Sequence, residues 1–293
     1  MIIAIFGIYI DPAFSRDLAR LFLLLKERNI NIFMYKPFYE FVLQQCHVQP
    51  DVAGLFNSGK DLPDQVQFLF SIGGDGTFLQ SVLTLKNKSI PAVGLNLGRL
   101  GFLSDISRDD MNEAIDQILN GHFEIEERSL LQLNEKEQLF GDFNYALNEI
   151  AVTKLDTSSM INIHTYLNGE YLSTYWADGL IIATPTGSTA YSLSVGGPIL
   201  TPDSKSIIIT PIAPHNLTVR PIVVPDNISI CLQVDGRGHQ FQASLDSRSQ
   251  AIDFPSKLHI GKADFHVKTL KLPGHGFFST LRNKLMWGAD KRN

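Results

Sequence analysis

A glycine turn that carries a single carboxylate separates an apolar strand from a helical segment. The apolar run Phe68–Ile72 leads into Gly73-Gly74-Asp75-Gly76, and residues 77–83 then have helical character. Glycine permits positive φ and lets the backbone approach a phosphate chain closely, and N–H groups at a helix start favour anions. A carboxylate there would repel phosphate unless it holds a metal ion or accepts a proton from an attacking hydroxyl. The turn therefore predicts phosphoryl transfer.

Strand and helix signals alternate over the first part of the chain. Strands are expected at 2–6, 31–35, 52–56, 68–72 and 92–95, and helices at 13–28, 77–83 and 111–119. This alternation predicts an α/β domain over residues 1–123, Rossmann-like, with a mostly parallel sheet and helices on both faces.

Strand signals dominate after residue 123. Two alternating runs, 162–167 and 171–176, flank Asn168-Gly169, a dipeptide that favours a two-residue hairpin turn. Further strand-like runs follow at 207–212, 222–224, 228–234 and 240–245. We expect a β-rich domain over residues 124–272, and a helical segment within 273–293 that returns to the first domain.

Composition argues against several functional classes. The net charge is −5 and the sequence has no Lys/Arg run, so we expect no nucleic-acid partner. No apolar run reaches the length of a membrane span, and the N-terminus is typical of a buried strand rather than a signal peptide. Cys46 and Cys231 form no CxxC pair, which fits a reducing compartment. We therefore expect a cytoplasmic protein with no membrane partner.

Two common nucleotide motifs fail on inspection. Residues 54–60 have the spacing of a phosphate-binding P-loop, but Asp61 follows where a Ser or Thr hydroxyl should meet magnesium, and no helix pattern continues. The dinucleotide fingerprint G-x-G-x-x-G is absent. A nucleotide would have to bind by another route.

Three further segments carry polar groups next to apolar strands. The glycine-rich run Gly94–Leu103 is either a structural turn or a second wall of the same cleft, with Arg99 facing phosphate, and the two are compatible. Asn148-Glu149 interrupts an apolar strand. The pair either faces solvent at a bend of the strand or binds the hydroxyl groups of a sugar. The run Asp178–Pro198 is rich in Gly, Ser and Thr; Tyr191 and the apolar strand before it favour a buried ligand loop over a surface loop.

Together with the run Pro211–Pro221, these segments resemble the NAD kinase family in its bacterial form, from Ile2 to about Asp246. The resemblance implies phosphorylation of the 2′-hydroxyl of the adenosine ribose of NAD by ATP, or by polyphosphate in some members. It implies a divalent cation, for which Mg²⁺ is expected, and an NAD kinase-like two-domain fold. It also implies a homodimer or homotetramer whose site, at the domain cleft, is completed by a neighbouring subunit.

The resemblance assigns roles by position. It makes Asp75 the general base and places donor phosphates against Gly73, Gly74, Gly76 and Thr77. The positions that it implies for NAD binding are Asp75, Gly76, Asn148, Glu149, Asp178, Thr189, Ala190, Tyr191, Ser192, Leu193 and Ser194. Arg99, Trp176 and Arg248 are further candidates, although positions 97, 176 and 248 depart from the family pattern. The metal ligands stay unidentified.

Two other functions share part of this pattern. A diacylglycerol-type lipid kinase also has a Gly-Gly-Asp-Gly turn, but it would need an apolar patch or a basic face toward a bilayer. A module that only senses NAD(H) would need no base, so Asp75 disfavours it. Formation of NADP from NAD and ATP separates the three hypotheses.

Overall fold

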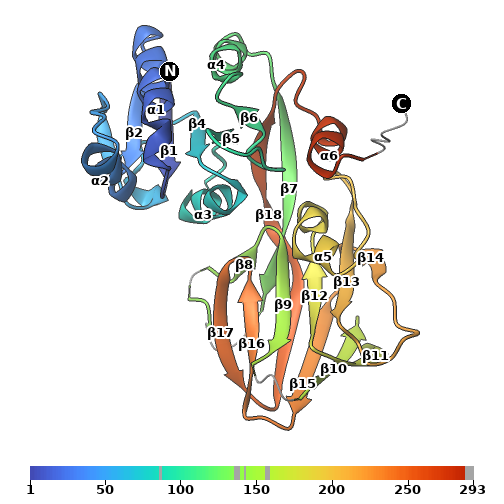
Figure 1. Ribbon diagram of the computed structural model, residues 1–293. Helices are drawn as coiled ribbons and strands as arrows, with labels where there is room; N and C mark the ends of the chain where they lie inside the picture. Colours follow the sequence, from blue (N-terminus) through green and yellow to red (C-terminus); the bar gives the residue numbers. More distant parts are fainter. Residues whose placement is uncertain (86–87, 135–138, 142, 156–158, 288–293) are drawn as a thin grey trace. The chain divides into compact units, whose positions relative to one another are not determined.

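The computed structural model describes residues 1–293 except 86–87, 135–138, 142, 156–158 and 288–293 (Figure 1). The chain forms two compact units. The first contains Met1–Glu127 together with Val267–Asn293, and the second contains Arg128–His266. The domain boundaries expected after residues 123 and 272 stay a prediction, and the last residues of the 273–293 segment lie outside the described part.

The first unit is an α/β structure with parallel strands, which confirms the expected fold class for this part of the chain. Its strand order is β18-β5-β4-β1-β2-β3, with β6 on β5. The strands are β1 (Ile2–Gly7), β2 (Asn31–Tyr35), β3 (Gly54–Phe56), β4 (Phe68–Ile72), β5 (Ala92–Asn96), β6 (Ile106–Ser107) and the end of β18 (Ser256–Lys271). The helices are α1 (Ser15–Glu27), α2 (Lys36–Gln45), α3 (Asp75–Leu85), α4 (Met111–Leu119) and α6 (Phe277–Leu285), with short 3-10 turns η1 (Pro12–Phe14) and η2 (Gly59–Asp61).

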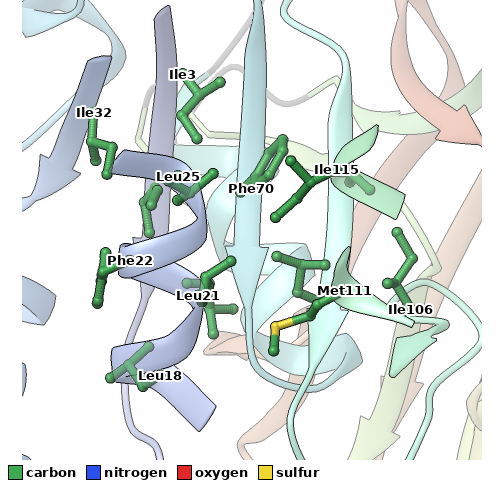
Figure 2. Packing of buried hydrophobic residues seen from close by; sticks show 14 of the residues in the cluster. Ile3, Leu18, Leu21, Phe22, Leu25, Ile32, Phe70, Ile106, Met111 and Ile115 are labelled. Atoms are coloured by element: carbon green, nitrogen blue, oxygen red, sulfur yellow. The ribbon is translucent and has the colours of Figure 1, made fainter. Parts of the chain in front are cut away.

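One face of this sheet is covered by α1 and α4. Figure 2 shows Leu25 of α1 beside Ile3 and Phe70 of the strands, with Ile115 of α4 on the other side of Phe70. Alternate strand residues point away from this cluster, as the period of a β-strand requires. The buried side chains of α3 lie outside the cluster, so α3 covers the opposite face.

The order of strands explains where a ligand can bind in the first unit. In chain order the strands run β1 to β5, but in the sheet β4 lies next to β1 rather than next to β3. The chain therefore reverses direction across the sheet between β1 and β4. In open α/β sheets, the loops at the carboxyl ends of the strands on either side of such a reversal form the usual ligand crevice. The turn after Ile72 of β4 is one of these loops.

The second unit is built almost entirely of antiparallel strands, which confirms the expected β-rich class. One sheet has the order β14-β13-β12-β9-β16-β17, and the other strands run in the order β11-β10-β15-β18. The elements are β7 (Glu124–Leu133, partly in the first unit), β8 (Tyr145–Ala146), β9 (Glu149–Lys154), β10 (Ile161–Leu167), β11 (Glu170–Ala177), β12 (Gly179–Ala183), β13 (Ser206–Ile212), β14 (Ile222–Pro225), β15 (Ile230–Gly236), β16 (Gln240–Leu245), β17 (Arg248–Asp253), η3 (Thr186–Thr189) and α5 (Tyr191–Ser194).

Both faces of β12 are buried, which explains its unbroken apolar sequence. Leu180 and Ile182 join the core shared by the two sets of strands, whereas Ile181 and Ala183 pack with Ile208 in a separate cluster. A strand that is buried on both faces needs no polar alternation. The loop that follows β12 is therefore attached to a strand that is packed on both faces.

Several elements differ from those expected. The hairpin of β10 and β11 is confirmed, and Asn168 and Gly169 have φ of 49° and 85° at its turn. Helix α2 was not foreseen, because it starts directly after β2 with Pro37 in its first turn, a place where proline is tolerated. The long strand β18 was also missed, since its polar residues interrupt the apolar alternation.

Candidate active site

The turn between β4 and α3 depends on glycine at its first position. Gly73 has φ of +143°, and a Cβ there would come within 2.5 Å of Thr77 Oγ1. Gly74 and Gly76 meet nothing closer than 4.0 Å and nothing within 4 Å, respectively, at the place where a Cβ would stand. The backbone at 74 and 76 is therefore open, and a large ligand group can approach it directly.

Asp75, the first residue of α3, holds the following glycine-rich loop through both carboxylate oxygens. Oδ1 accepts hydrogen bonds from the backbone N–H groups of Leu103 (2.9 Å) and Ser104 (3.0 Å), and Oδ2 accepts one from Phe102 (2.9 Å). Its side chain keeps 31% of its surface exposed. The carboxylate is thus fixed in position while one edge stays accessible to a ligand.

The loop after β5 can reach Asp75 only because Gly94 within β5 and Gly101 in the loop have no side chains. A Cβ on Gly101 would lie 1.8 Å from Asp75 Oδ1, and one on Gly94 would lie 2.4 Å from Leu103 O. The side chain of Asn96 stabilises the loop: its Oδ1 accepts a hydrogen bond from Gly98 N (2.9 Å) and its Nδ2 donates one to Arg99 O (2.6 Å). The structure therefore brings the two glycine-rich segments of the first unit together, as the second-wall hypothesis requires.

A cation from the far end of the chain reaches the same carboxylate. Lys284 of α6 places its Nζ 3.7 Å from Asp75 Oδ2 and 4.9 Å from the centre of the Phe102 ring. Lys284 also lines a cavity of about 550 Å³ together with Arg99, Gly101, Asp105, His275 and Thr280. This volume falls within the range of small-molecule sites.

In the second unit, Asn148-Glu149 is buried rather than exposed at a bend. Asn148 and Glu149 are 9% and 8% exposed. Asp246, which has φ of 51°, accepts backbone N–H bonds from Leu147 (2.9 Å), Asn148 (2.8 Å) and Glu149 (3.2 Å). The carboxylate of Asp246 therefore holds the backbone of Asn148 and Glu149 in position.

Both carboxyl groups of this cluster have raised pKa values. Burial raises the pKa of Glu149 to about 8, the charge of Asp246 adds to the rise, and the Tyr191 backbone N–H opposes it by hydrogen bonding. Burial likewise raises the pKa of Asp246, although its three N–H partners act the other way. Glu149 Oε2 is buried and has no hydrogen-bond partner among the residues that the structure describes. A buried acceptor without a partner is costly unless a ligand or water satisfies it.

The hydroxyl groups after β12 bond to the chain itself, both within the loop and to Leu147 and Thr210 outside it. Thr184 Oγ1 donates to Leu147 O at 2.6 Å, Ser188 Oγ donates to Pro185 O at 2.6 Å, and Ser192 Oγ lies 3.1 Å from Thr210 Oγ1. The alternative of a surface loop does not hold for residues 184, 186, 188 and 192, which are buried. These side chains therefore support the loop.

Close backbone contact between this loop and Asn148 requires glycine at 187. A Cβ there would lie 2.0 Å from Asn148 O. We expect Gly187→Ala to lower the free energy of unfolding by about 2–4 kcal/mol, as overpacking against backbone does. Chemical denaturation measures this, with Gly261→Ala as control because a Cβ there meets only Asn134 Nδ2 at 3.9 Å. Equal stability of the two variants would contradict the contact.

The segment 189–194 lies next to Glu149, but Asp178 does not. Tyr191 starts α5, donates its N–H to Glu149, and has 43% of its surface exposed. The other positions are Thr189 and Ala190 just before α5, and Ser192, Leu193 and Ser194 within it. Ala183 pairs with Glu149 at one end of β12, whereas Asp178 lies beyond the other end. At a rise of about 3.3 Å per residue, the stretch from Asp178 to Ala183 is about 17 Å long.

Asp178 belongs to a separate polar group. Its Oδ1 lies 2.6 Å from Lys154 Nζ, and both side chains are partly exposed. Nearby, Trp176 is 48% exposed and its ring lies 4.2 Å from the His215 ring, while His215 N donates to Trp176 O. The second unit therefore presents two polar regions instead of one.

The remaining candidates have different surroundings. Arg99 is exposed at the cavity wall. Arg248 donates to the carbonyl oxygens of Phe143 and Tyr145, so its guanidinium already has structural partners. Leu97, which departs from the family pattern, is 4% exposed and packs in the core of the first unit. Contact of Arg99, Trp176 and Arg248 with a ligand stays a prediction.

Sequence reasoning missed two residues that the structure places against the candidate site residues, Asp246 and Lys284. Asp246 is a polar residue directly after β16, whose sequence alternates polar and apolar residues. Lys284 carries no local signal, because its neighbours in the sequence say nothing about Asp75. Within the described ranges, no three His, Cys, Asp or Glu side chains gather to hold a metal ion, and no helix combines the length and apolar character needed to cross a bilayer.

Comparisons with known proteins agree over nearly the whole chain. The family model of the ATP-NAD kinase N-terminal domain matches residues 19–123, and that of the ATP-NAD kinase C-terminal domain matches residues 147–272. The chain is 45% identical to the NAD kinase of Flavobacterium johnsoniae over 295 residues, covering 100% of both chains. It is 48% identical to the NAD kinase of Bacteroides fragilis over 289 residues, covering 99% of both.

Solved structures show the same two-domain fold. Yeast NADH kinase in complex with NADH has a TM-score of 0.85 at 24% identity, covering 99% of this chain and 89% of the yeast chain. An NAD kinase from Archaeoglobus fulgidus in complex with ATP has a TM-score of 0.76 at 25% identity, covering 98% of this chain and 99% of the archaeal chain. The expected two-domain architecture is thereby confirmed.

Proposed function

This chain belongs to the NAD kinase family and phosphorylates NAD with ATP, and we propose that Asp75 is the base that receives the proton of the acceptor hydroxyl. The observation that carries the proposal is the fixed carboxylate of Asp75, held by three backbone N–H groups beside the open backbone of Gly74 and Gly76. The lipid-kinase and sensing-module alternatives receive no support from the comparisons.

The reaction that we propose has a simple balance. The O–H bond of the 2′-hydroxyl of the adenosine ribose breaks, and its proton passes to Asp75. A bond forms between the 2′-oxygen and the terminal phosphorus of ATP. The bond from that phosphorus to its bridging oxygen breaks, and ADP leaves with the electron pair. Because such transition states are loose, positioning and charge stabilisation contribute more than the base itself.

Glu149 is proposed to hold the acceptor ribose. Its buried Oε2 has no hydrogen-bond partner in the described part of the chain and can accept hydrogen bonds from ribose hydroxyl groups. Asn148 would add an amide donor and acceptor beside it, and Asp246 would fix both residues through the backbone. Residues 189–194 are proposed to complete the NAD-binding region, since Tyr191 N already contacts Glu149.

Donor phosphates are proposed to lie against Gly73, Gly74, Gly76 and Thr77. The backbone at 74 and 76 is open, which supports this assignment. The residues present also fit a divalent cation, expected to be Mg²⁺, that enters with the phosphates, because such an ion needs only one or two carboxylates. Asp105 and Asp110, which line the cavity, would supply them. Such an ion would offset negative charge on the transferred group.

The experiment that tests the function is NADP formation by the purified chain. With NAD, ATP and Mg²⁺ we expect NADP and ADP in equal amounts. A reaction with polyphosphate in place of ATP tests which phosphoryl donor is used, and a reaction with excess EDTA tests whether a divalent cation is required. NAD binding without turnover would instead support a sensing module. We also propose a cytoplasmic location, supported by two cysteines that form no disulfide.

We propose that the chain acts as a homodimer or homotetramer, and that Asp178 and Trp176 serve the site of a neighbouring subunit. Their position beyond the far end of β12 from Glu149 supports this. After co-refolding of Asp75→Asn with Asp178→Asn, half of the dimers would be mixed and would keep one intact site of two. We therefore expect about a quarter of wild-type turnover from the mixture. Activity equal to the average of the two variants alone would contradict shared sites.

A further inference from the structure

Lys284 is the only Lys or Arg side chain among the described residues for which an ion pair with Asp75 is observed. The Lys284 ammonium approaches Asp75 Oδ2, the oxygen that also accepts a hydrogen bond from Phe102 N. The ammonium lies over the Phe102 ring. The two side chains are 28% and 31% exposed. The ring and the carboxylate together thus hold a positive charge at the accessible edge of Asp75.

The ion pair between Lys284 and Asp75 contributes little to the stability of the fold. An ion pair that is partly open to solvent contributes about 0–1 kcal/mol. Two carboxylates, Asp105 and Asp110, face the same cavity as Lys284, together with Arg99 and His275. The cavity thus offers Lys284 a position between the carboxylate of Asp75 and a space large enough for a polyphosphate group.

We propose that Lys284 is a donor-binding residue whose ammonium contacts the phosphoryl group that is transferred. This inference rests on the proposed role of Asp75. Before ATP binds, the ammonium pairs with Asp75; when the phosphates enter, it pairs with the more highly charged terminal phosphate instead. It then neutralises charge that develops on the phosphoryl oxygens, which is the larger part of catalysis in this class of reaction. The C-terminal helix α6 is therefore part of the active site of the first unit.

The test compares Lys284→Met, which removes the charge and keeps most of the length, with Lys284→Arg, which keeps the charge. We expect Lys284→Met to lower kcat/KM for ATP by about 100-fold, with KM for NAD changed less than about twofold, because the loss concerns the donor and its transition state. Lys284→Arg should recover at least part of the loss. The matched control is Lys271→Met, whose ammonium lies 3.3 Å from Glu124 in the same unit.

Results in the other direction would overturn the inference. They are a kcat/KM for ATP within twofold of wild type, a loss confined to KM for NAD, or a loss that vanishes after correction for the folded fraction seen by circular dichroism. The binding of inorganic tripolyphosphate, measured by calorimetry, gives a readout without turnover: it should weaken in Lys284→Met and not in Lys271→Met. Asp75→Asn is assayed in parallel, so that a failure of the proposed base is seen separately from a failure of Lys284.

Discussion

Replacing Asp75 by Asn is expected to lower kcat by about 10²–10⁴-fold, the range that a general base contributes. The amide cannot take the proton of the acceptor hydroxyl, whereas the Asp75 carboxylate is held in place by Phe102, Leu103 and Ser104. KM for NAD should change little, because we assign the ribose contacts to Glu149. Steady-state kinetics with varied NAD and ATP measures both quantities.

The substitution also disturbs structure, so it needs a matched control. An Asn side chain keeps an acceptor for Leu103 and Ser104, but its amide nitrogen would face the Phe102 N–H and the Lys284 ammonium. Asp61→Asn is the control, since Asp61 Oδ2 accepts from Asn57 N (3.0 Å) and Ser58 N (2.9 Å) in the same unit. If both variants lost turnover equally, the effect would be structural and not catalytic.

At pH 9, where the side chain is ionised, replacing Glu149 by Gln is expected to raise KM for NAD by about 10–100-fold, since hydrogen bonds to a charged group are worth about 1.5–3 kcal/mol. Below pH 8 the free Glu149 is mostly protonated, because burial raises its pKa to about 8. Ribose hydroxyls donate best to the ionised form, so NAD affinity of the wild type should improve as pH rises from 6.5 to 9. The Gln variant should lack this dependence, and titration calorimetry across the pH range measures it.

Stability provides an independent check on Glu149. Its folded pKa lies above the ordinary value of 4.5, so the folded protein binds the extra proton, and stability falls as pH rises from about 4.5 through about 8. Relative to Glu149→Gln, the wild type should lose about 2–5 kcal/mol of unfolding free energy between pH 5 and pH 9. Glu170→Gln, at an exposed position on β11, is the control. If the difference in unfolding free energy between wild type and Glu149→Gln did not change with pH, the pKa of the Glu149 carboxyl would not be raised.

Much of the first unit could be predicted because its strands are short, mostly apolar runs separated by polar or glycine-containing segments. The strands at 31–35 and 68–72 and the helix at 111–119 have the expected bounds. Helix α2 escaped because it is short and rich in aromatic residues, so its periodicity is weak. The hairpin at Asn168-Gly169 was predictable because its turn depends on two neighbouring residues alone.

The site was predictable only where its chemistry is local. Asp75 and its glycines form one turn, and Asn148-Glu149 form one bend, so each could be read from adjacent residues. Asp246 reaches Glu149 from another strand, and Lys284 reaches Asp75 from the last helix. Pairings of this kind are set by tertiary packing, which short-range patterns do not encode. The separation of Asp178 from Glu149 is likewise a matter of strand register.

The most direct test of Asp75 as the base is a single-turnover experiment with NAD and ATP on wild type and Asp75→Asn, with the product examined by phosphorus NMR. We predict that wild type places the phosphate on the 2′-oxygen of the adenosine ribose, and that the variant binds NAD with similar affinity but transfers at least about 100-fold more slowly. Transfer by the variant at the wild-type rate, or a phosphate on the other ribose, would contradict the proposed roles of Asp75 and Glu149.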